Sequence, residues 1–221
     1  MKTITQRILQ QTMADNPALR ECESAIVSIW ESLLLCFRKG GKLLLCGNGG
    51  SASDCEHIVG ELMKGFVLPR QLPDSVKARI AAAWPEQGDY LSSHLQGALP
   101  AISLVSHVSL STAFINDVAA DMVYAQQVYG YGKHGDTLLA LSTSGNAENV
   151  INAVRIAKIC GMESIAITGS KGGKLAHLAD NVIRLPAEKT YRIQELTLAV
   201  YHCLCAMLEM EIFTPDDAVS L

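Results

Sequence analysis

The segment KLLLCGNGGSASDCEHIVGE, residues 42–61, decides the fold of this 221-residue chain. Its first five residues form an apolar run typical of a buried strand, and the glycines that follow permit a tight turn. Ser51 is a favourable N-cap for a helix that carries His57 and Glu61. The segment therefore predicts a strand, a glycine loop and a helix in succession.

A glycine loop in front of a helix is a potential anion site. Free N–H groups and the positive end of the helix dipole point into such a loop, and a phosphate can approach glycines closely. The loop lacks the Lys-Ser/Thr of a P-loop and the GxGxxG order of a dinucleotide-binding fold. Taken alone, the pattern also fits an ordinary turn of a parallel α/β protein.

A second polar loop follows another buried strand. Residues 137–141, TLLAL, lead into the sequence Ser142-Thr143-Ser144-Gly145-Asn146 ahead of a predicted helix. Ligands bind at the carboxyl edge of open α/β sheets, where these side chains would lie. A phosphate would accept hydrogen bonds from them and from the helix N-terminus. An ordinary polar turn with N-caps is the alternative interpretation.

The order of the elements indicates the fold class. Strands alternate with helices, which predicts a three-layer α/β sandwich around a parallel sheet of five strands. The predicted strands are residues 42–46, 100–105, 137–141, 164–168 and 181–185. Two helices precede the first strand and end near residue 38. With 49% apolar residues, the chain is expected to form one domain, residues 1–221.

The last predicted helix, about residues 190–212, is apolar on nearly all sides. A helix of this kind is buried on most faces, and at the end of a chain of this length an oligomer contact is the simplest way to bury it. We therefore expect the C-terminal helix, and the apolar faces of the N-terminal helices, to take part in subunit contacts.

Residues 67–98 interrupt the alternation and have the pattern of an insertion. Pro69, Pro73 and Pro85 divide this segment, with a possible short helix at residues 74–84. A connection of this length in a compact domain is usually a lid or an interface element, and a poorly ordered loop is the alternative.

Composition excludes several classes of protein. The formal net charge of -4 argues against a general nucleic-acid binder. No uncharged apolar run reaches the roughly 18 residues of a membrane span, and no leader-like segment opens the chain, so we expect a cytoplasmic protein. The seven cysteines are odd in number and lie mostly in apolar runs, which is typical of reduced, buried thiols.

Four motifs together resemble one family. They are GNGGS, His-x3-Glu, STSGN, and RIQE with a histidine eight residues after the glutamine. This set resembles the sugar isomerase (SIS) domain family, and most closely its phosphoheptose isomerases, over nearly the whole chain apart from the insertion. The resemblance implies the SIS fold, which is Rossmann- or flavodoxin-like, and a homotetramer.

The resemblance also implies the residues of the site. His57, Glu61, Gln194 and His202 match the catalytic and zinc-binding group, with Glu61 and His202 as the catalytic pair and one zinc ion per site. The residues implied to contact the sugar phosphate are Asn48, Gly49, Gly50, Ser51, Asn116, Asp117, Ser142, Thr143, Ser144 and Gln194.

The chemistry supports this assignment on its own terms. Moving a carbonyl between C1 and C2 of a sugar phosphate requires a base, an acid and a means of stabilising the enediolate. Glu61 and His202 are suited to the first two roles, and zinc would polarise the carbonyl. His57 and Glu61 lie one helical turn apart and can reach one ion. The alternative is a surface pair on the helix and a core histidine at position 202.

Gln194 does not fit simply beside His202. Eight residues of regular helix separate them by about 12 Å. Either Gln194 lies at a loosened helix start and reaches the site, or different subunits supply different ligands. We favour a site at a subunit boundary.

Three features depart from the family pattern. Ala147 occupies a position where many phosphoheptose isomerases carry serine, so one hydrogen bond to phosphate would be lost. Tyr191 precedes Arg-Ile-Gln where some members carry aspartate. The insertion at 67–98 follows the Glu61 helix and would lie near the mouth of the site, where it would influence which sugar fits.

These observations predict an aldose–ketose isomerase, with sedoheptulose 7-phosphate as substrate and glycero-manno-heptose 7-phosphate as product. One alternative is a non-catalytic SIS protein, similar to a relative that binds the bacterial replication initiator and lacks the glutamate and the late histidine. Another is a sugar-phosphate sensor whose insertion contacts a partner.

Overall fold

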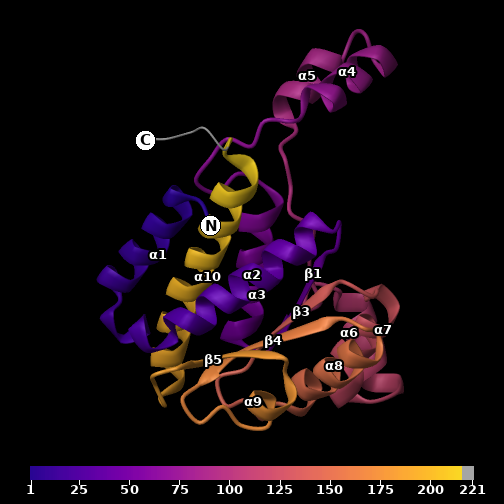
Figure 1. Cartoon of the computed structure of the whole chain (residues 1–221). Helices are drawn as coiled ribbons and strands as arrows, with labels where there is room; N and C mark the ends of the chain where they lie inside the picture. The colour runs from indigo at the N-terminus through magenta and orange to yellow at the C-terminus, as the bar shows by residue number, and fades with distance from the viewer. Residues whose placement is uncertain (216–221) are drawn as a thin grey trace.

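The computed structural model describes residues 1–215 and contains one sheet of five parallel strands (Figure 1). Their order is β2-β1-β3-β4-β5. The strands are β1 (Leu43–Gly47), β2 (Ala101–Ser103), β3 (Thr137–Leu141), β4 (Glu163–Gly169) and β5 (Asn181–Leu185). This confirms the predicted α/β fold class. The chain reverses its direction of growth between β1 and β3, so their carboxyl ends flank a topological switch point.

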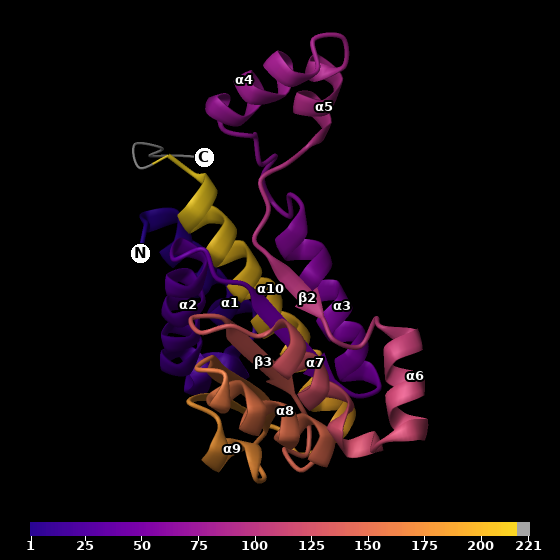
Figure 2. The same ribbon diagram turned by 90° about the vertical axis from the view of Figure 1, so that its right-hand side faces the viewer.

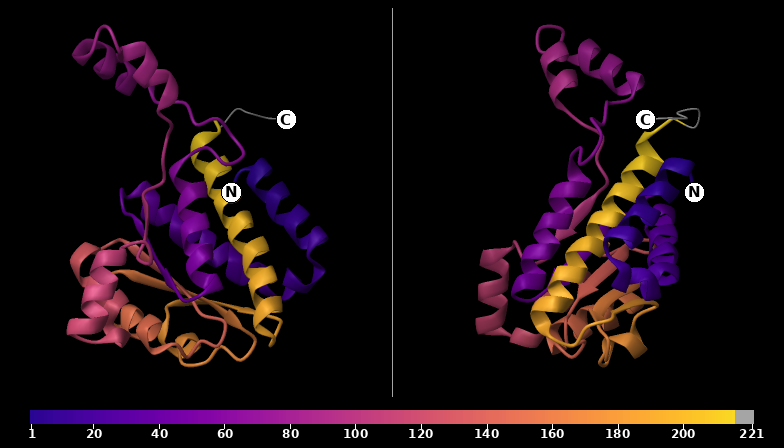
Figure 3. Two further views of the ribbon diagram at one scale, coloured as in Figure 1. Left: turned by 180° about the vertical axis from the view of Figure 1, so that it is seen from behind. Right: turned by 90° about the vertical axis from the view of Figure 1, so that its left-hand side faces the viewer.

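Helices cover both faces of the sheet and complete three layers (Figure 3). On one face lie α2 (Glu23–Arg38), α3 (Gly50–Met63) and α10 (Thr190–Phe213), with α1 (Thr3–Asp15) packed against α10. On the other lie α7 (Val123–Tyr131), α8 (Glu148–Ile159) and α9 (Leu175–Leu178). Two 3-10 turns, Pro17–Cys22 and Ala120–Met122, precede α2 and α7.

Alternation along β1 divides its side chains between two cores. Leu43 and Leu45 join the core under α2, α3 and α10, whereas Leu44 and Cys46 join the core under α7 and α8. Successive side chains of a strand point to opposite faces, so a central parallel strand must be apolar throughout. The continuous runs in β1 and β3 were therefore reliable predictors of strands.

The helix α10 is largely buried within its own chain, so an oligomer contact is not required to bury most of it. It packs against α1, α2 and α3 as well as against β4 and β5. Among the described residues it is the one helix long and apolar enough to cross a membrane, but 67% of that window is buried inside the protein. It is the core helix of the fold, and its role in an oligomer contact stays a prediction.

The cysteines agree with the expectation from the sequence. All seven are free, and only Cys160 is not buried, as expected of reduced thiols.

Two elements begin or end at other residues than predicted. The first residues of the second predicted helix form a 3-10 turn instead of an α-helix. The strand predicted at 100–105 is shorter and spans Ala101–Ser103, because the chain turns directly after it toward α6 (Val108–Asp117).

The insertion is a helical hairpin that projects from the body of the molecule (Figure 2). It consists of α4 (Asp74–Ala83), close to the predicted helix, and α5 (Gly88–His94), which the sequence analysis did not predict. The helices pack on each other, and Gly88 allows close approach because a Cβ there would lie 2.8 Å from the Ala81 Cα. No residue of α4 is buried.

A buried ion pair fastens the base of this hairpin to α10. Arg70 and Glu209 are 1% and 0% exposed, and the Arg70 Nε donates to Glu209 Oε1 at 2.7 Å. The same carboxylate accepts the backbone N–H groups of residues 66, 67 and 68. The Arg70 guanidinium also donates to the Leu62 and Glu61 carbonyl oxygens, which caps the end of α3. The buried carboxylate of Glu209 and the buried guanidinium of Arg70 therefore each have several hydrogen-bond partners.

Removing the charge of Glu209 is expected to destabilise the protein strongly. The substitution Glu209→Gln leaves the Arg70 cation buried without its partner, a situation that costs about 3–5 kcal/mol. Urea denaturation measures the loss of unfolding free energy. The matched control is Glu188→Gln, which removes the same charge from an exposed ion pair with Lys171 and should change the midpoint little. Equal effects of the two substitutions would contradict this account.

Candidate active site

The glycine loop between β1 and α3 has the geometry of an anion site. Gly49 is the N-cap of α3 and has a φ of 58°, a conformation that favours glycine. Ser51 was predicted to be this N-cap, but it lies buried in the first turn. The first turn contains no acidic residue, so no negative charge opposes the positive end of the helix.

A pair of side-chain amides holds the glycine loop to the first turn of α8, directly after the second polar loop. The Nδ2 of Asn48 donates to Asn149 Oδ1, and the Nδ2 of Asn149 donates back to Asn48 Oδ1, both at 2.9 Å. The hydroxyl of Tyr124 donates to the Gly47 carbonyl at 2.6 Å. These contacts join the carboxyl ends of β1 and β3 at the switch point of the sheet.

The second loop, residues 142–146, presents its side chains at different depths. Ser142 is buried, Thr143 is half-buried and Ser144 is exposed. Gly145 has a φ of 65°, and a Cβ there would lie 1.9 Å from the carbonyl oxygen of Gly172. No other residue fits that turn without displacing the neighbouring loop. The predicted phosphate-binding segments therefore lie together at one edge of the sheet.

A second group of predicted residues meets between α3 and α10. The Nε2 of His57 lies 3.1 Å from Glu61 Oε1, and its Nδ1 lies 2.8 Å from the Tyr201 hydroxyl. The rings of His57 and His202 are 5.0 Å apart, centroid to centroid. We call His57, Glu61 and His202 the histidine–glutamate cluster. All of its members belong to the same chain.

Two polar atoms of this cluster lack hydrogen-bond partners. Glu61 Oε2 and His202 Nε2 are both buried without one, although Lys64 Nζ lies 3.6 Å from the carboxylate oxygen. Burial lowers the pKa of His202, the charge of His57 lowers it further, and Glu61 opposes the shift. His202 is therefore neutral near pH 7. Unpaired buried polar atoms are costly in a folded protein, so these two indicate a ligand.

Gln194 lies apart from this cluster in the same chain. A Cβ on Gly50 would lie 2.2 Å from the Gln194 Nε2, which places this amide beside the glycine loop. Eleven residues of α3, about 16 Å of helix, separate Gly50 from Glu61. The helix α10 begins at Thr190, so the loosened helix start considered for Gln194 is not observed.

Asn116 and Asp117 are placed at the exposed end of α6. The Asn116 Nδ2 donates to Asp117 Oδ1 at 2.8 Å. The structure thus pairs these residues with each other instead of joining them to the two loops or to the histidine–glutamate cluster.

Four residues that the sequence analysis did not select contact the site. Asn149 and Tyr124 hold the glycine loop, while Tyr201 and Asp54 contact each other next to His57. Asp54 was detectable in principle because it lies one helical turn before His57 and shares its face. The contribution of the other three depends on contacts between distant parts of the chain.

The donor atoms of the histidine–glutamate cluster suit a zinc ion. Zinc in proteins prefers imidazole nitrogen and carboxylate oxygen, and two such atoms here lack partners. Within residues 1–215, no three His, Cys, Asp or Glu side chains converge closely enough to count as a formed metal centre. His57 Nε2 and Glu61 Oε1 instead face each other, and an ion would have to take the place of that contact.

Comparison with known proteins identifies the family. The SIS domain model matches residues 107–208. A phosphoheptose isomerase from Rhodospirillum rubrum is 36% identical over 92% of this chain and 95% of its own length. One from Roseiflexus is 37% identical over 85% of this chain and 82% of its own. The chain belongs to the phosphoheptose isomerase family. This confirms the resemblance found in the sequence, and with it the expectation of an isomerase.

Solved structures of phosphoheptose isomerases share the fold. The enzyme from Neisseria gonorrhoeae aligns with a TM-score of 0.69 at 31% identity, covering 94% of this chain and 99% of that one. The enzyme from Francisella tularensis aligns with a TM-score of 0.71 at 27% identity, covering 95% and 100%. The phosphoheptose isomerase fold therefore accounts for nearly the whole length of the chain.

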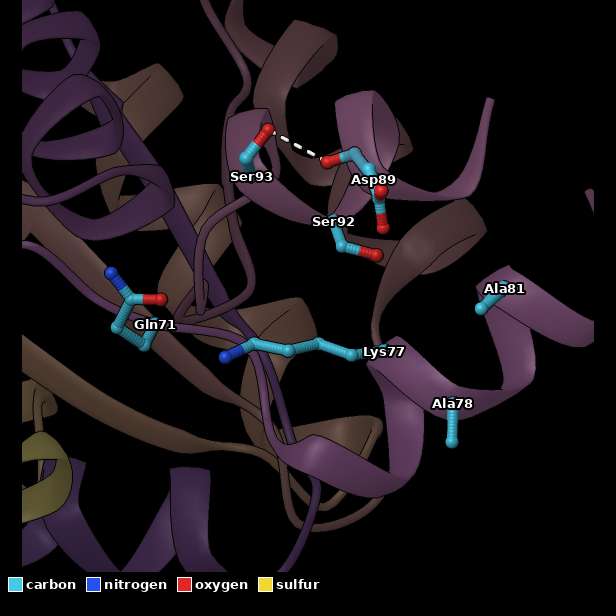
Figure 4. A pocket seen from close by; sticks show the side chains of 7 residues that line it. All are labelled: Gln71, Lys77, Ala78, Ala81, Asp89, Ser92 and Ser93. Carbon is cyan, nitrogen blue, oxygen red and sulfur yellow. Dashed lines mark hydrogen bonds between the residues drawn. The ribbon is translucent and has the colours of Figure 1, made fainter. Parts of the chain in front are cut away.

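Within this phosphoheptose isomerase fold, the insertion has a pocket of its own, of about 420 Å³ (Figure 4). It lies between α4 and α5, and Lys77 and Gln71 line one side of it. The Ser93 hydroxyl on its wall already donates to the Asp89 carbonyl at 2.7 Å. The pocket contains neither the glycine loop nor the histidine–glutamate cluster, so it is separate from the candidate active site.

Loss of the amide pair between the loops is expected to weaken phosphate binding. The substitution Asn149→Ala removes two hydrogen bonds that hold Asn48, and each neutral bond contributes about 0.5–1.5 kcal/mol. Calorimetric titration with inorganic phosphate should show a several-fold weaker affinity. The control Gln11→Ala removes an exposed amide bond to Asp15 on α1 and should leave that affinity unchanged. Unaltered binding by Asn149→Ala would show that the loops do not depend on this pair.

Proposed function

We propose that the protein converts sedoheptulose 7-phosphate into glycero-manno-heptose 7-phosphate. The observation that supports this most strongly is the histidine–glutamate cluster, because it brings a carboxylate and a neutral imidazole together beside α3 in a member of the phosphoheptose isomerase family. These are the two groups that aldose–ketose isomerisation requires.

The phosphate of the substrate binds between the two loops in this proposal. The N-termini of α3 and α8, together with the side chains of Asn48, Ser51 and residues 142–144, supply donors at the switch point. The amide of Gln194 lies beside Gly50, and in this proposal it contacts the substrate near this end. In this proposal, Asn116 and Asp117 contact the sugar hydroxyls in one of two ways. Either α6 moves toward the two loops, or these two residues reach the site of a neighbouring subunit.

The proton transfers follow from the positions of Glu61 and His202. Glu61 removes a proton from C1 of the ketose while His202 donates a proton to the carbonyl oxygen at C2, which gives the enediol. Glu61 then returns its proton to C2, and His202 recovers a proton from the C1 hydroxyl as the aldehyde forms. His57 holds one carboxylate oxygen of Glu61, and the other, which has no hydrogen bond, receives the substrate proton. A neutral His202 carries one ring N–H and can donate that proton without carrying a permanent positive charge.

We also propose that His57, Glu61 and His202 hold a zinc ion. When bound, zinc would polarise the carbonyl and stabilise the enediolate charge. Gln194, which the family resemblance implied as a fourth ligand, lies at the other end of α3, and this position supports a substrate contact more than a ligand role within one chain.

A homotetramer in the cytoplasm completes the proposal. The helix α6 supports a subunit contact, because none of its residues is buried. Val108 and Ile115 on the helix, and Val118 directly after it, are exposed apolar residues. The non-catalytic alternatives are less well supported, because a protein that only binds a partner or senses a sugar does not need Glu61 and His202 brought together.

Removing the proposed base should abolish turnover without abolishing binding. The substitution Glu61→Gln keeps the shape of the side chain and removes its proton-transfer function, so kcat should fall by a factor of about 10² to 10⁴ while sugar-phosphate affinity changes little. A coupled assay of heptose phosphate formation measures this. The matched control is Glu56→Gln on the same helix, which alters an exposed carboxylate bonded to Ser106. Wild-type turnover by Glu61→Gln would reject the assignment of Glu61.

A further inference from the structure

Donors of the protein itself occupy the carbonyl oxygens of the glycine loop. The Gly47 carbonyl accepts from the Tyr124 hydroxyl at 2.6 Å. The carbonyls of residues 48 and 49 accept backbone N–H groups in the first turn of α3, at 3.1 and 3.0 Å. The N–H groups of Gly49 and Gly50, in contrast, donate to no group within residues 1–215. The loop therefore offers a ligand backbone donors and no free carbonyl oxygen.

The loop after β3 has the same property. Each carbonyl oxygen of residues 142–145 accepts a hydrogen bond at 3.0 Å, three of them from backbone N–H groups and one from the side chain of Asn146. The amide oxygen of Asn146 is used as well, by the Lys174 N–H at 3.0 Å. In both loops, therefore, the amide and carbonyl acceptors are engaged inside the protein.

Two buried hydroxyls, one at each loop, lack a partner. Ser51 and Ser142 are 6% and 8% exposed, and neither hydroxyl forms a hydrogen bond within residues 1–215. Polar groups buried without a partner indicate a ligand. Because the carbonyl oxygens around them are engaged, the acceptor for these two protons has to come from the ligand.

The side chain of Asn48 is turned so that it also donates. The N–H of Val150 donates to Asn149 Oδ1 at 3.0 Å, which determines which end of the Asn149 amide is the acceptor. The Asn149 Nδ2 therefore donates to Asn48 Oδ1 at 2.9 Å, and the Tyr124 hydroxyl lies 3.3 Å from the same oxygen. The Asn48 Nδ2 uses one proton on Asn149 and keeps the other for a ligand.

A site with donors only distinguishes the protonation states of a phosphate group. The dianion presents acceptor oxygens alone, whereas the monoanion carries a P–O–H whose proton needs an acceptor. A serine hydroxyl that accepted this proton would leave its own proton without an acceptor. The first turn of α3 has no acidic residue, and Glu148 in the first turn of α8 already accepts from Arg155 at 2.7 Å.

We infer that Tyr124 and Asn149 are positioning residues that determine specificity: they engage the Gly47 carbonyl and the Asn48 amide oxygen, so that the two loops bind the phosphate group of the substrate as its dianion. The inference rests on the proposed binding of phosphate between the loops, and it deepens that proposal by naming the protonation state that binds. Burial raises the pKa of Tyr124, so its hydroxyl stays a donor.

The titratable groups around the loops have to be separated from the titration of the ligand. They come from α3, α7, α8, α9 and α10, and the two histidines of the histidine–glutamate cluster lie at the other end of α3. A group that changes charge between pH 5 and pH 7 alters the affinity for any dianion, and sulfate, a dianion throughout this range, measures that contribution. The groups are Asp54 and Glu56 on α3, Asp121 ahead of α7, Glu148 and Arg155 on α8, Lys171, Lys174 and the exposed His177 at α9, and Arg192 and Glu195 on α10.

Calorimetric titration with glycerol 3-phosphate and with sulfate, at pH 5 and pH 7, tests the inference. A phosphate monoester loses its second proton with a pKa of about 6, so the share of dianion falls about tenfold from pH 7 to pH 5. The affinity for glycerol 3-phosphate, taken relative to that for sulfate, should fall by the same factor of about ten. At pH 7 sulfate should compete with glycerol 3-phosphate for the site.

The variant Tyr124→Phe separates this role from a structural one. It keeps the buried ring and releases the Gly47 carbonyl, so sulfate binding should weaken by a factor of about 2 to 10, the effect of one neutral hydrogen bond. The tenfold pH preference should shrink, because the released carbonyl can accept the proton of the monoanion. Asn149→Ala should act in the same way by letting the Asn48 amide rotate. A purely structural loss would weaken both ligands and leave the preference at about tenfold.

The control Tyr129→Phe, at an exposed tyrosine on the same helix, should match the wild type, and circular dichroism confirms that each variant is folded. Three results would overturn the inference: a glycerol 3-phosphate affinity that follows sulfate between pH 7 and pH 5, an unchanged pH preference in Tyr124→Phe, or a wild-type protein that binds neither anion.

Isomerisation of the sugar phosphate is scored in a separate assay. A protein that isomerises it but binds the monoanion as tightly as the dianion keeps the proposed function and loses the inference. A protein that shows the predicted anion preference without isomerisation loses the proposed function alone.

Discussion

The register between α3 and α10 is the constraint on which the site depends. The two helices run in the same direction, so that Gln194 lies beside Gly50, Tyr201 beside His57, and Glu209 beside the segment that follows α3. The buried ion pair of Arg70 and Glu209 fixes this register at its far end. A slip of one helical turn, 5.4 Å, would separate the histidine–glutamate cluster and also leave two buried charges unpaired.

The two ends of α3 accordingly have different tasks. Its N-terminus lies at the switch point of the sheet, where the glycine loop and the loop after β3 are joined by Asn48 and Asn149. Its last turns carry His57 and Glu61 toward α10, where the proton transfers are proposed to occur. One rigid helix thus sets the distance between the part of the site suited to phosphate and the part suited to chemistry.

The features that the sequence predicted well are those that depend on local pattern. The buried runs of β1 and β3, the glycine at position 49 and the pairing of His57 with Glu61 are all set within a few residues. The family resemblance added His202, which no local pattern connects to α3.

The features that were missed depend on contacts across the chain. Arg70 meets Glu209 over 139 residues, and Tyr201 meets His57 over 144. Because α10 is apolar on nearly all sides, the sequence suggested that an oligomer buries it. In the structure, α1 packs on the side of α10 that does not face the sheet. Ser51 was a reasonable N-cap by residue type, yet Gly49, with its positive φ, is the N-cap, so the helix starts two residues earlier than a serine cap requires.

A crystal structure of the Glu61→Gln variant with bound sedoheptulose 7-phosphate tests the central claim most directly. The account predicts phosphate density between the glycine loop and residues 142–144, with C1 and C2 of the sugar next to position 61 and His202. Phosphate bound elsewhere, for example in the pocket of the insertion, or a sugar whose C1 and C2 point away from the α3–α10 interface, would contradict it.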